Sequence, residues 1–487
     1  MKLRTHRLLN VSSQILSALS LAACSFTAQR LTTTVNPTVD PIEAAWVVIG
    51  EGGQASARAI TRDTICPEFR QDGIRETMQV RVAASTPALR PTVSTPELSK
   101  PSAFPVLVCE ASLRADAKSA QIAGRALALP KANPQKILII GDTGCRLQQN
   151  SSYYQGCNDA TKWGFPMLAK TAASFHPDLV IHVGDYHYRE NACPPDQALC
   201  QNSPWGYGWD TWQADFFAPA APLLQVAPWV MVRGNHESCS RAGQGWWRFL
   251  DPRPFLQERS CDDPTFDMAG DFSAPYAVPL QPASSSFIPI HGAPQTLNAQ
   301  LIIFDSSKIA NKVLAKTDPA YAIYTRQLAG VDQLAQNADF SLFLNHHPIL
   351  GFASVRGKQG TLEFRPGHVA LQALMQNSHP ERLFPAKVQA TIAGHVHLFE
   401  AISFASDHPT QFVSGNGGSS LDLALPNQLP QGTTPFEQAR VAQFFNSDEV
   451  GFMLMERIGD AWKVEAWNQY GKLLKRCRLQ GQVTTCE

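Results

Sequence analysis

Five apolar stretches of the sequence each end in side chains that commonly bind metal ions. The terminal residues are Asp142 after KILIIG, Asp185 after LVIHVG, Asn235 after WVMVRG, His346 and His347 after FSLFLN, and His395 and His397 after ATIAG. In open α/β sheets, ligands gather in the crevice beyond the carboxyl ends of the strands. We therefore expect these side chains to converge on one site.

The chemistry of these side chains indicates a pair of metal ions. Imidazoles and an amide oxygen suit divalent transition metals, whereas carboxylates suit a harder ion. The carboxylate of Asp185 has two oxygens and can therefore bridge two cations. Two metals about 3.5–4 Å apart can hold a hydroxide and clamp both ends of an in-line phosphoryl displacement. The sequence contains neither a P-loop nor a Gly-x-Ser-x-Gly motif, which would have indicated other chemistry.

The elements that position these residues follow from the pattern of apolar positions. From residue 136 onwards, apolar stretches alternate with helical segments, which predicts βα units. Residues 159–175 have apolar side chains near helical spacing, and residues 451–479 are expected to form a β-meander. Residues 191–222 and 251–295 are rich in Pro, Gly and Ser, and we expect them to form long surface loops that set specificity.

The N-terminal part of the chain predicts export. Residues 1–24 combine a positively charged start, a short apolar stretch and the sequence Leu-Ala-Ala-Cys, as in a bacterial lipoprotein signal peptide with Cys24 as the lipid acceptor. The alternative is an ordinary cleaved signal with a chance cysteine. Residues 25–43 are expected to form a tether and residues 44–133 a small β-sandwich-like domain. The catalytic domain would then span residues 136–487.

Cysteine content supports an oxidising compartment. The chain has 11 cysteines, and without Cys24 the remaining ten fall into neighbouring pairs. The pairs are Cys66 and Cys109, Cys145 and Cys157, Cys193 and Cys200, Cys239 and Cys261, and Cys477 and Cys486. Sequence spacing leaves the connectivity open. We expect an exported protein of the bacterial cell envelope, periplasmic, anchored in the outer membrane by its lipid, or secreted.

The charge balance argues against a nucleic-acid partner. Lysine plus arginine and aspartate plus glutamate number 41 each, so the formal net charge is zero and no basic field is evident. We therefore expect a small phosphate-ester substrate, and contact with a membrane only through the lipid on Cys24. The oligomeric state stays open.

The metal-type motifs, taken in order, resemble the five sequence blocks of calcineurin-like metallophosphoesterases. They are Gly141-Asp142-Thr143-Gly144, Gly184-Asp185, Gly234-Asn235-His236-Glu237, Asn345-His346-His347-Pro348 and Gly394-His395-Val396-His397. The resemblance implies an α/β fold in which a β-sandwich is flanked by helices (αββα). A small all-β N-terminal domain ahead of it is similar to the architecture of the larger purple acid phosphatases.

One departure from the superfamily pattern makes the resemblance more specific. Gly144 stands where many members of the superfamily have a histidine, and Tyr188 follows Asp185 by three residues. The pairing of Gly-Asp-x-Gly with Gly-Asp-x-x-Tyr is similar to that of purple acid phosphatases, in which the tyrosine binds ferric iron. The resemblance therefore implies Fe³⁺ in the Tyr188 site and Fe²⁺, Zn²⁺ or Mn²⁺ in the second.

The same resemblance implies a role for each motif residue. The first metal would take Asp142, Asp185, Tyr188 and His397, and the second would take Asp185, Asn235, His346 and His395. His346 is preferred over His347 as the ligand because Pro348 follows it by two residues, as in the family pattern. His236 is the first candidate for the acid that protonates the leaving oxygen, and His347 is the second.

The sequence thus predicts an exported two-metal phosphoesterase that hydrolyses phosphomonoesters through a metal-bound hydroxide. A phosphodiesterase or nucleotidase with the same metals is the nearest alternative, and a non-catalytic surface lipoprotein is a more distant one. His182 lies inside an apolar stretch and is expected to be a core histidine. Arg146 and Arg189 follow two metal motifs, where they would contact substrate anions or simply carry surface charge.

Overall fold

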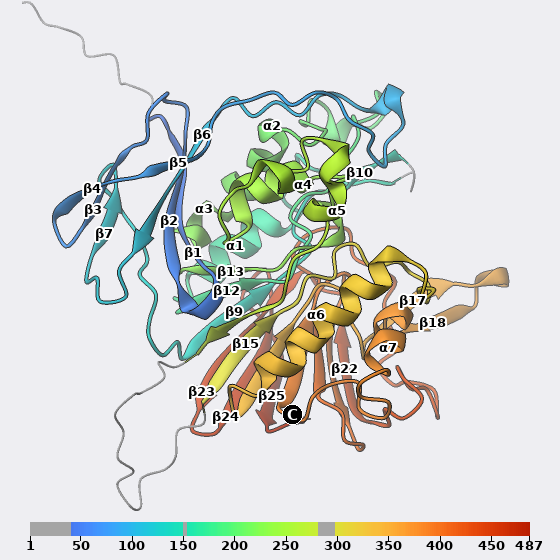
Figure 1. Ribbon diagram of the computed structural model, residues 1–487. Helices are drawn as coiled ribbons and strands as arrows, with labels where there is room; N and C mark the ends of the chain where they lie inside the picture. Colours follow the sequence, from blue (N-terminus) through green and yellow to red (C-terminus); the bar gives the residue numbers. More distant parts are fainter. Residues whose placement is uncertain (1–39, 150–152, 281–297) are drawn as a thin grey trace, which may run out of the picture. The chain divides into compact units, whose positions relative to one another are not determined.

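Two large β-sheets lie face to face and carry the predicted metal-binding loops at their edge (Figure 1). The structure is a computed structural model that describes residues 40–149, 153–280 and 298–487. The predicted signal peptide and nearly all of the predicted tether lie outside these residues. The assignment of domains along the chain stays a prediction.

The larger sheet contains eleven strands and the smaller one seven. The larger sheet has the order β26 (Val483–Cys486), β25 (Leu473–Gln480), β24 (Ala461–Asn468), β23 (Gly451–Ile458), β9 (Lys136–Ile140), β12 (Leu179–His182), β13 (Trp229–Met231), β1 (Ile42–Ile49), β2 (Ala55–Thr61), β6 (Leu107–Leu113), β5 (Gln79–Val82). The smaller sheet has the order β14 (Tyr276–Pro279), β15 (Ala299–Ile303), β16 (Phe340–Leu344), β19 (Val388–Ala393), β21 (Thr410–Ser414), β20 (Phe399–Phe404), β22 (Val441–Ser447).

The central strands of both sheets run parallel. β9, β12 and β13 pair in parallel in the larger sheet, as do β15, β16, β19 and β21 in the smaller one. Their residues are nearly all buried, as parallel strands covered on both faces require. All five predicted motif strands are confirmed, and each metal motif follows the carboxyl end of its strand.

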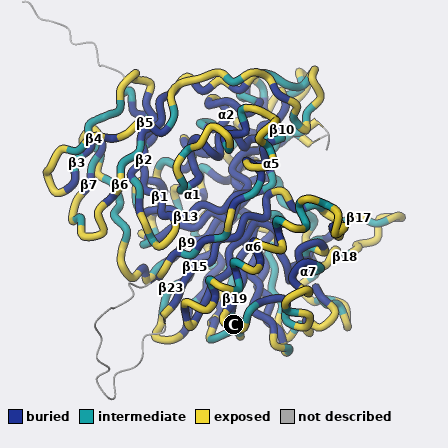
Figure 2. The backbone as a smooth tube through the Cα atoms, viewed as in Figure 1, coloured by how far each residue is buried: buried dark blue, intermediate teal, exposed yellow. Residues whose placement is uncertain are grey.

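The core between the sheets is built from alternate strand residues. Ile139 of β9 and Ile181 of β12 belong to one buried cluster with Leu301, Leu342 and Ile392 of the opposite sheet. Each such side chain contributes about 1.5–3 kcal/mol when it leaves water. Figure 2 shows most of the central strands as buried. A rigid core of this kind fixes where the loops at the strand ends lie.

Helices cover the outer face of each sheet. α1 (Phe165–Ala173) and α3 (Ala218–Leu224) pack on the larger sheet, and α6 (Pro319–Ala335) and α7 (Val369–Met375) pack on the smaller one (Figure 1). α6 begins where the Asp318 side chain accepts the N–H of Ala320, at 2.9 Å. The predicted α/β sandwich flanked by helices is therefore confirmed.

The N-terminal region is all-β, as predicted. β1 pairs in parallel with β13 and antiparallel with β2, so these strands continue the larger sheet. A separate four-stranded sheet has the order β4 (Ile74–Thr77), β3 (Glu68–Gln71), β7 (Ala120–Ile122), β8 (Arg125–Ala126). Phe69 of β3 packs in a small core with residues of β1, β2 and β6.

The C-terminal strands β23 to β26 form the predicted meander. The cysteines pair as Cys66–Cys109, Cys145–Cys157, Cys193–Cys200, Cys239–Cys261 and Cys477–Cys486. Five disulfides indicate an extracellular or exported protein, because cytosolic thiols are kept reduced. Within the described residues, no helix has the length and apolarity that crossing a membrane requires.

Residues 191–222 differ from the expected long surface loop. They form short helical segments, and Trp209 and Trp212 are buried in the core beneath α3. The aromatic side chains outweigh the turn-forming Pro and Gly residues, because burying each indole removes a large apolar area from water.

The remaining elements are short. The helical turns are η1 (Glu51–Gly53), η2 (Pro96–Leu98), η4 (Ala198–Cys200), α2 (Trp209–Trp212), η5 (Gln213–Phe217), η6 (Asn235–Glu237), α4 (Gly243–Gly245), η7 (Trp246–Leu250), η8 (Gln257–Arg259), η9 (Pro264–Phe266), α5 (Asp267–Gly270) and η10 (Lys358–Gly360). Two hairpins complete the elements of the described residues, β10 (Leu147–Gln148) with β11 (Tyr153–Tyr154) and β17 (Phe352–Arg356) with β18 (Leu362–Pro366).

Candidate metal centre

Three of the predicted ligands lie in loops with an unusual backbone conformation. Asp142, Asp185 and His395 have φ angles of 57°, 59° and 68°. The left-handed region is uncommon for residues other than glycine, and it costs free energy that the surrounding structure must offset. At each of these positions, the sharp turn directs a polar side chain toward the same point beyond the sheet edge.

The first cluster consists of Asp142, Asp185, Tyr188 and His397. The Tyr188 hydroxyl lies 3.0 Å from Asp142 Oδ1, 2.8 Å from Asp185 Oδ2 and 2.8 Å from His397 Nε2. His397 Nε2 also lies 3.2 Å from Asp142 Oδ1. The other ring nitrogen of His397 donates to the Ser420 carbonyl at 2.5 Å.

The second cluster consists of Asp185, Asn235, His346 and His395. His346 Nε2 lies 3.2 Å from Asp185 Oδ2 and 3.1 Å from Asn235 Oδ1. His395 Nδ1 lies 2.9 Å from the same amide oxygen. His346 Nδ1 donates to the Val183 carbonyl at 2.9 Å. Asp185 belongs to both clusters, as a bridging ligand must.

The donor atoms of both clusters fit bound cations. Because His346 and His397 donate their Nδ1–H groups to backbone carbonyls, each turns the lone pair of Nε2 toward a carboxylate oxygen. Acceptors that face acceptors in a buried site repel one another unless a cation or a proton lies between them. The carbonyl partners also match the usual environment of metal-binding histidines. One ligand atom each from Asp185, His346 and His395 lies within 4.8 Å of the others.

The electrostatics of the second cluster agree with this arrangement. Burial would raise the pKa of Asp185, but His346 and His236 hold it well below its usual range. Burial would lower the pKa of His346, but its attraction to Asp185 outweighs that effect and raises the pKa to about 9. The pocket therefore keeps Asp185 as a carboxylate and favours positive charge beside it.

Glu237 holds the loop that carries Asp185. Its buried carboxylate accepts the N–H groups of Asp185 at 3.0 Å, Tyr186 at 2.9 Å and Gly234 at 3.1 Å. Burial and the nearby Asp185 raise the pKa of Glu237 to about 8. Sequence reasoning gave Glu237 no role, although it lies in the same motif as Asn235.

Asp215 plays a similar part for the loop that carries Tyr188. This buried carboxylate accepts the N–H groups of Cys145 at 3.1 Å, Tyr188 at 2.8 Å and Arg189 at 3.1 Å. It also accepts the Arg189 Nε–H at 2.5 Å. Nothing in the sequence around Asp215 indicated this role, because the contacts join segments far apart in the chain.

His236 lies beside both clusters. Its Nδ1 is 3.1 Å from Glu190 Oε1, its Nε2 is 3.9 Å from Asp185 Oδ2, and its ring centroid is 3.9 Å from that of Tyr188. Glu190 also accepts the Nε–H of Arg241 at 2.7 Å. A buried carboxylate thus fixes the orientation of the imidazole, and sequence reasoning missed Glu190.

His347 lies beside the second cluster, against His395. Its Nδ1 is 3.0 Å from the Ser306 hydroxyl, and its ring centroid is 4.2 Å from that of His395 and 4.9 Å from that of His368. Burial, and after it the charges of His395 and His368, hold the pKa of His347 well below its usual range. This imidazole is therefore neutral near pH 7.

His182 is the core histidine that the sequence predicts. Its Nε2 lies 3.0 Å from the Thr143 hydroxyl, and its Nδ1 accepts the N–H of Gly184 at 3.2 Å. Both ring nitrogens are thus satisfied away from the ligand clusters.

A cavity of about 640 Å³ opens beside the second cluster. His395 forms part of its wall, and the hairpin of β17 and β18 closes another side. Its polar lining residues include Asn311, Ser354, Arg365, His368 and Asp422. Cavities of roughly 300–1,000 Å³ are the usual size for small-molecule sites.

Comparison with known proteins agrees with this geometry. The profile of the calcineurin-like phosphoesterase family matches residues 135–399, which contain every residue of both clusters. The purple acid phosphatase PPD1 from yellow lupin (Lupinus luteus) seeds aligns with a TM-score of 0.51 and 15% identity over 89% of this chain and 73% of that chain. A structure of PhoD aligns with a TM-score of 0.49 and 11% identity over 93% of each chain. No curated protein sequence matches this chain. At such low identity, the lupin enzyme shows a shared fold.

Proposed function

The chain belongs to the calcineurin-like phosphoesterase family, and from this premise we propose that it is an exported phosphomonoesterase similar to purple acid phosphatases. The observation that carries the proposal is the position of the Tyr188 hydroxyl, within 3.0 Å of Asp142, Asp185 and His397. A phenolate among two carboxylates and an imidazole is a ligand set for a hard, highly charged ion.

The two clusters suit different metals. Asp142, Asp185, Tyr188 and His397 would hold Fe³⁺, since ferric iron accepts tyrosinate in proteins. Asn235, His346 and His395 would hold Fe²⁺, Zn²⁺ or Mn²⁺ together with Asp185. When bound, such a pair supplies a nucleophile from water at neutral pH and neutralises charge on the phosphate oxygens.

The protein's own residues would complete the reaction by handling the proton of the leaving group. We assign the general acid to His236, because Glu190 orients its ring and Arg241 fixes Glu190 in turn. His347 is the second candidate. Burial lowers the pKa of both imidazoles, so the preference for His236 rests on its contact with Glu190.

The cavity beside His395 favours one alternative. Its volume of about 640 Å³ leaves room for an organic group as large as a nucleoside. A phosphodiesterase or a nucleotidase with the same metals would use this space for the second ester group or the leaving alcohol. A surface lipoprotein without activity is the least favoured alternative, because both ligand clusters are complete.

The location of the protein is part of the proposal. The five disulfides support export. We propose that Cys24 carries the lipid and anchors the chain in the bacterial envelope. Mass spectrometry of the protein from a membrane fraction would test this, because Cys24→Ser should release an unlipidated protein.

The test of the activity combines metal analysis with hydrolysis assays. We expect about two metal ions per chain, a visible absorption band and faster hydrolysis of p-nitrophenyl phosphate than of bis(p-nitrophenyl) phosphate. Asp185→Asn, which removes the shared carboxylate, should lose metal and activity together. Faster hydrolysis of the diester would support the phosphodiesterase alternative, and no hydrolysis of either ester by the metal-loaded protein would contradict an enzymatic role.

A further inference from the structure

Arg146 lies on the open side of the first cluster. Its guanidinium carbon is 5.1 Å from the centre of the Tyr188 ring, and its Nη2 is 3.5 Å from His397 Nε2. The side chain is partly exposed, as are those of the second-cluster residues Asn235 and His395. These three side chains therefore reach solvent beside the two clusters.

Within the part of the chain that the structure describes, the guanidinium of Arg146 lacks an anionic partner. No carboxylate among the described residues lies within ion-pair distance of it, and its buried Nε–H has no hydrogen-bond acceptor there. Arg189, which follows the second metal motif, differs in both respects. It pairs with Asp215 at 2.5 Å and stacks over Trp163 at 5.1 Å. Arg189 thus has a structural role, whereas the N–H groups of Arg146 are available to bind an external anion.

An unpaired guanidinium next to sites for two cations is unfavourable on its own. Like charges repel in a partly buried site, and a buried N–H group without an acceptor loses the hydrogen bond that it made to water. An anion bound between the guanidinium and the cation sites would remove both costs. Arginine suits a phosphate group particularly well, because its planar fork binds two oxygens at once.

We propose that Arg146 binds a terminal oxygen of the substrate phosphate and thereby favours monoesters over diesters. This inference rests on the proposed function and specifies its substrate class. A monoester has three terminal oxygens and a diester has two. If the cation sites engage two of them, an oxygen remains for Arg146 only in the monoester.

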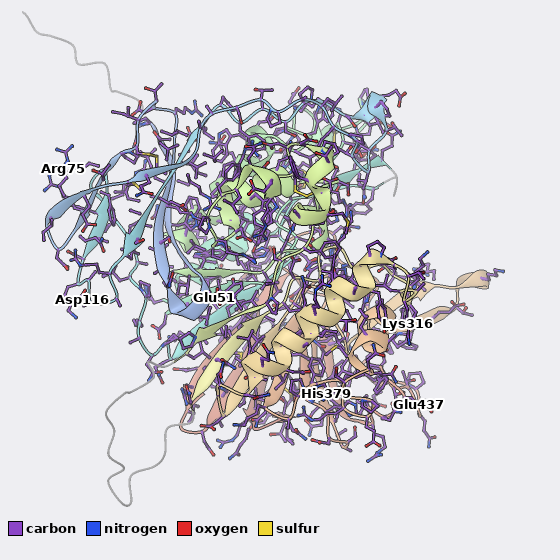
Figure 3. All side chains as sticks on the ribbon, viewed as in Figure 1. Glu51, Arg75, Asp116, Lys316, His379 and Glu437 are labelled. Carbon is purple, nitrogen blue, oxygen red and sulfur yellow. A yellow bond between two sulfur atoms is a disulfide. The ribbon has the colours of Figure 1, made fainter. Side chains whose placement is uncertain are left out.

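The test compares Arg146→Gln and Arg146→Lys with Arg75→Gln as a matched control. Arg75 lies at the surface (Figure 3), 72% exposed, on β4 of the four-stranded sheet, which carries none of the cluster residues. We expect Arg146→Gln to weaken the binding of inorganic phosphate by about tenfold or more, measured by calorimetry. It should lower kcat/KM for p-nitrophenyl phosphate by about 10–100-fold and that for bis(p-nitrophenyl) phosphate by less than about threefold. Arg146→Lys should recover part of the loss, and Arg75→Gln should change neither quantity.

Metal content and the visible spectrum provide the independent readout. Both should stay as in the wild type, because the proposal gives Arg146 no part in metal binding. Equal losses for monoester and diester, unchanged phosphate affinity, or a shifted visible band would overturn the proposal, the last by showing that Arg146 acts on Tyr188. A wild-type protein that binds phosphate through Arg146 but hydrolyses neither ester would refute the proposed function and leave the anion site standing. If Arg146→Gln fails to fold, Arg146→Lys provides the test, because lysine keeps the positive charge and lacks only the planar pair of N–H donors.

Discussion

Gly144 packs directly against the backbone of Tyr188. A Cβ atom at position 144 would lie 2.8 Å from the Tyr188 nitrogen, 2.8 Å from the Tyr186 carbonyl oxygen and 2.9 Å from Asp215 Oδ2. A side chain at position 144, where the family resemblance would place a histidine, would therefore require this backbone to shift. The glycine at position 144 and the hydroxyl that Tyr188 supplies to the first cluster therefore belong to one packing arrangement.

Gly144→Ala tests this packing. The added methyl group must displace the Tyr188 loop, which we expect to cost roughly 1–3 kcal/mol of stability and to lower the affinity of the first cluster for metal. Thermal unfolding and metal content would measure both effects. Gly330→Ala, in the middle of α6, is the matched control, because alanine favours the helix and its Cβ would meet only side-chain atoms of Pro275 among the described residues, Cγ at 3.1 Å and Cδ at 3.7 Å. Equal metal content in the two variants would refute the close packing.

Tyr188→Phe tests the identity of the first metal. If the phenol binds ferric iron, the variant should lose its visible absorption band and most of its iron, and circular dichroism should stay unchanged. Tyr186→Phe is the matched control, because the Tyr186 hydroxyl bonds to the Val232 carbonyl at 3.1 Å, inside the core. A colourless wild-type protein with two divalent ions would count against a role for Tyr188 as a ligand.

The fold and the ligand clusters were largely predictable from the sequence, for a physical reason. Parallel strands covered on both faces are continuous apolar stretches, so their ends are visible in the sequence. Once the strands share a sheet edge, residues such as Asp142 and His395 must meet. The order of the motifs then limited the site to a single family of folds.

The supporting residues were not predictable in the same way. Asp215 and Glu237 act on backbone N–H groups, which every residue except proline has, so no side-chain pattern identifies their partners. Asp215 lies in a stretch whose Pro and Gly content indicated loops, while its tryptophans drive helical packing. The continuation of the larger sheet from β13 into β1 also depends on a pairing between segments that are distant in the sequence.

Glu237→Gln tests the support of Asp185. The amide keeps one acceptor oxygen where the carboxylate has two, so the loop loses part of its anchoring. We expect metal affinity to fall about 10–100-fold, the usual effect of losing an outer-sphere partner. Competition with a chelator would measure it, and Glu258→Gln on the exposed surface is the control. An unchanged metal affinity would show that Glu237 serves the fold alone.

His236→Ala tests the assignment of the general acid. A poor leaving group such as an alkoxide needs a proton in the transition state, whereas p-nitrophenolate leaves readily without one. We therefore expect kcat for an alkyl phosphate to fall about 10²–10⁴-fold, and kcat for p-nitrophenyl phosphate to fall much less. His347→Ala should affect both substrates alike. The reverse pattern would transfer the role to His347.

Glu400 gives the protein a predicted pH-dependent stability that is independent of the metal ligands. This carboxyl on β20 is fully buried, and its Oε2 accepts the Phe352 N–H at 3.0 Å. Its other oxygen has no hydrogen-bond partner among the described residues. Burial, with repulsion from Asp422 added, raises the pKa of Glu400 to about 8. The folded state therefore keeps a proton that the unfolded chain releases near pH 4.5.

The sign of the pH effect follows from this difference. Below about pH 4.5 both states are protonated and Glu400 costs nothing, whereas between pH 4.5 and 8 the unfolded state gains free energy by ionising. Stability should therefore fall by roughly 3 kcal/mol between about pH 5 and 7.5 through this group. Glu400→Gln cannot ionise. Its free energy of unfolding, measured with denaturant at a series of pH values, should therefore not show this decrease. Glu437 is exposed on the surface (Figure 3), so the stability of Glu437→Gln should depend on pH as that of the wild type does. If the free energies of unfolding of the wild type and Glu400→Gln changed with pH in the same way, Glu400 would have to be ionised in the folded protein. A compensating cation or water would then have to lie beside its free oxygen.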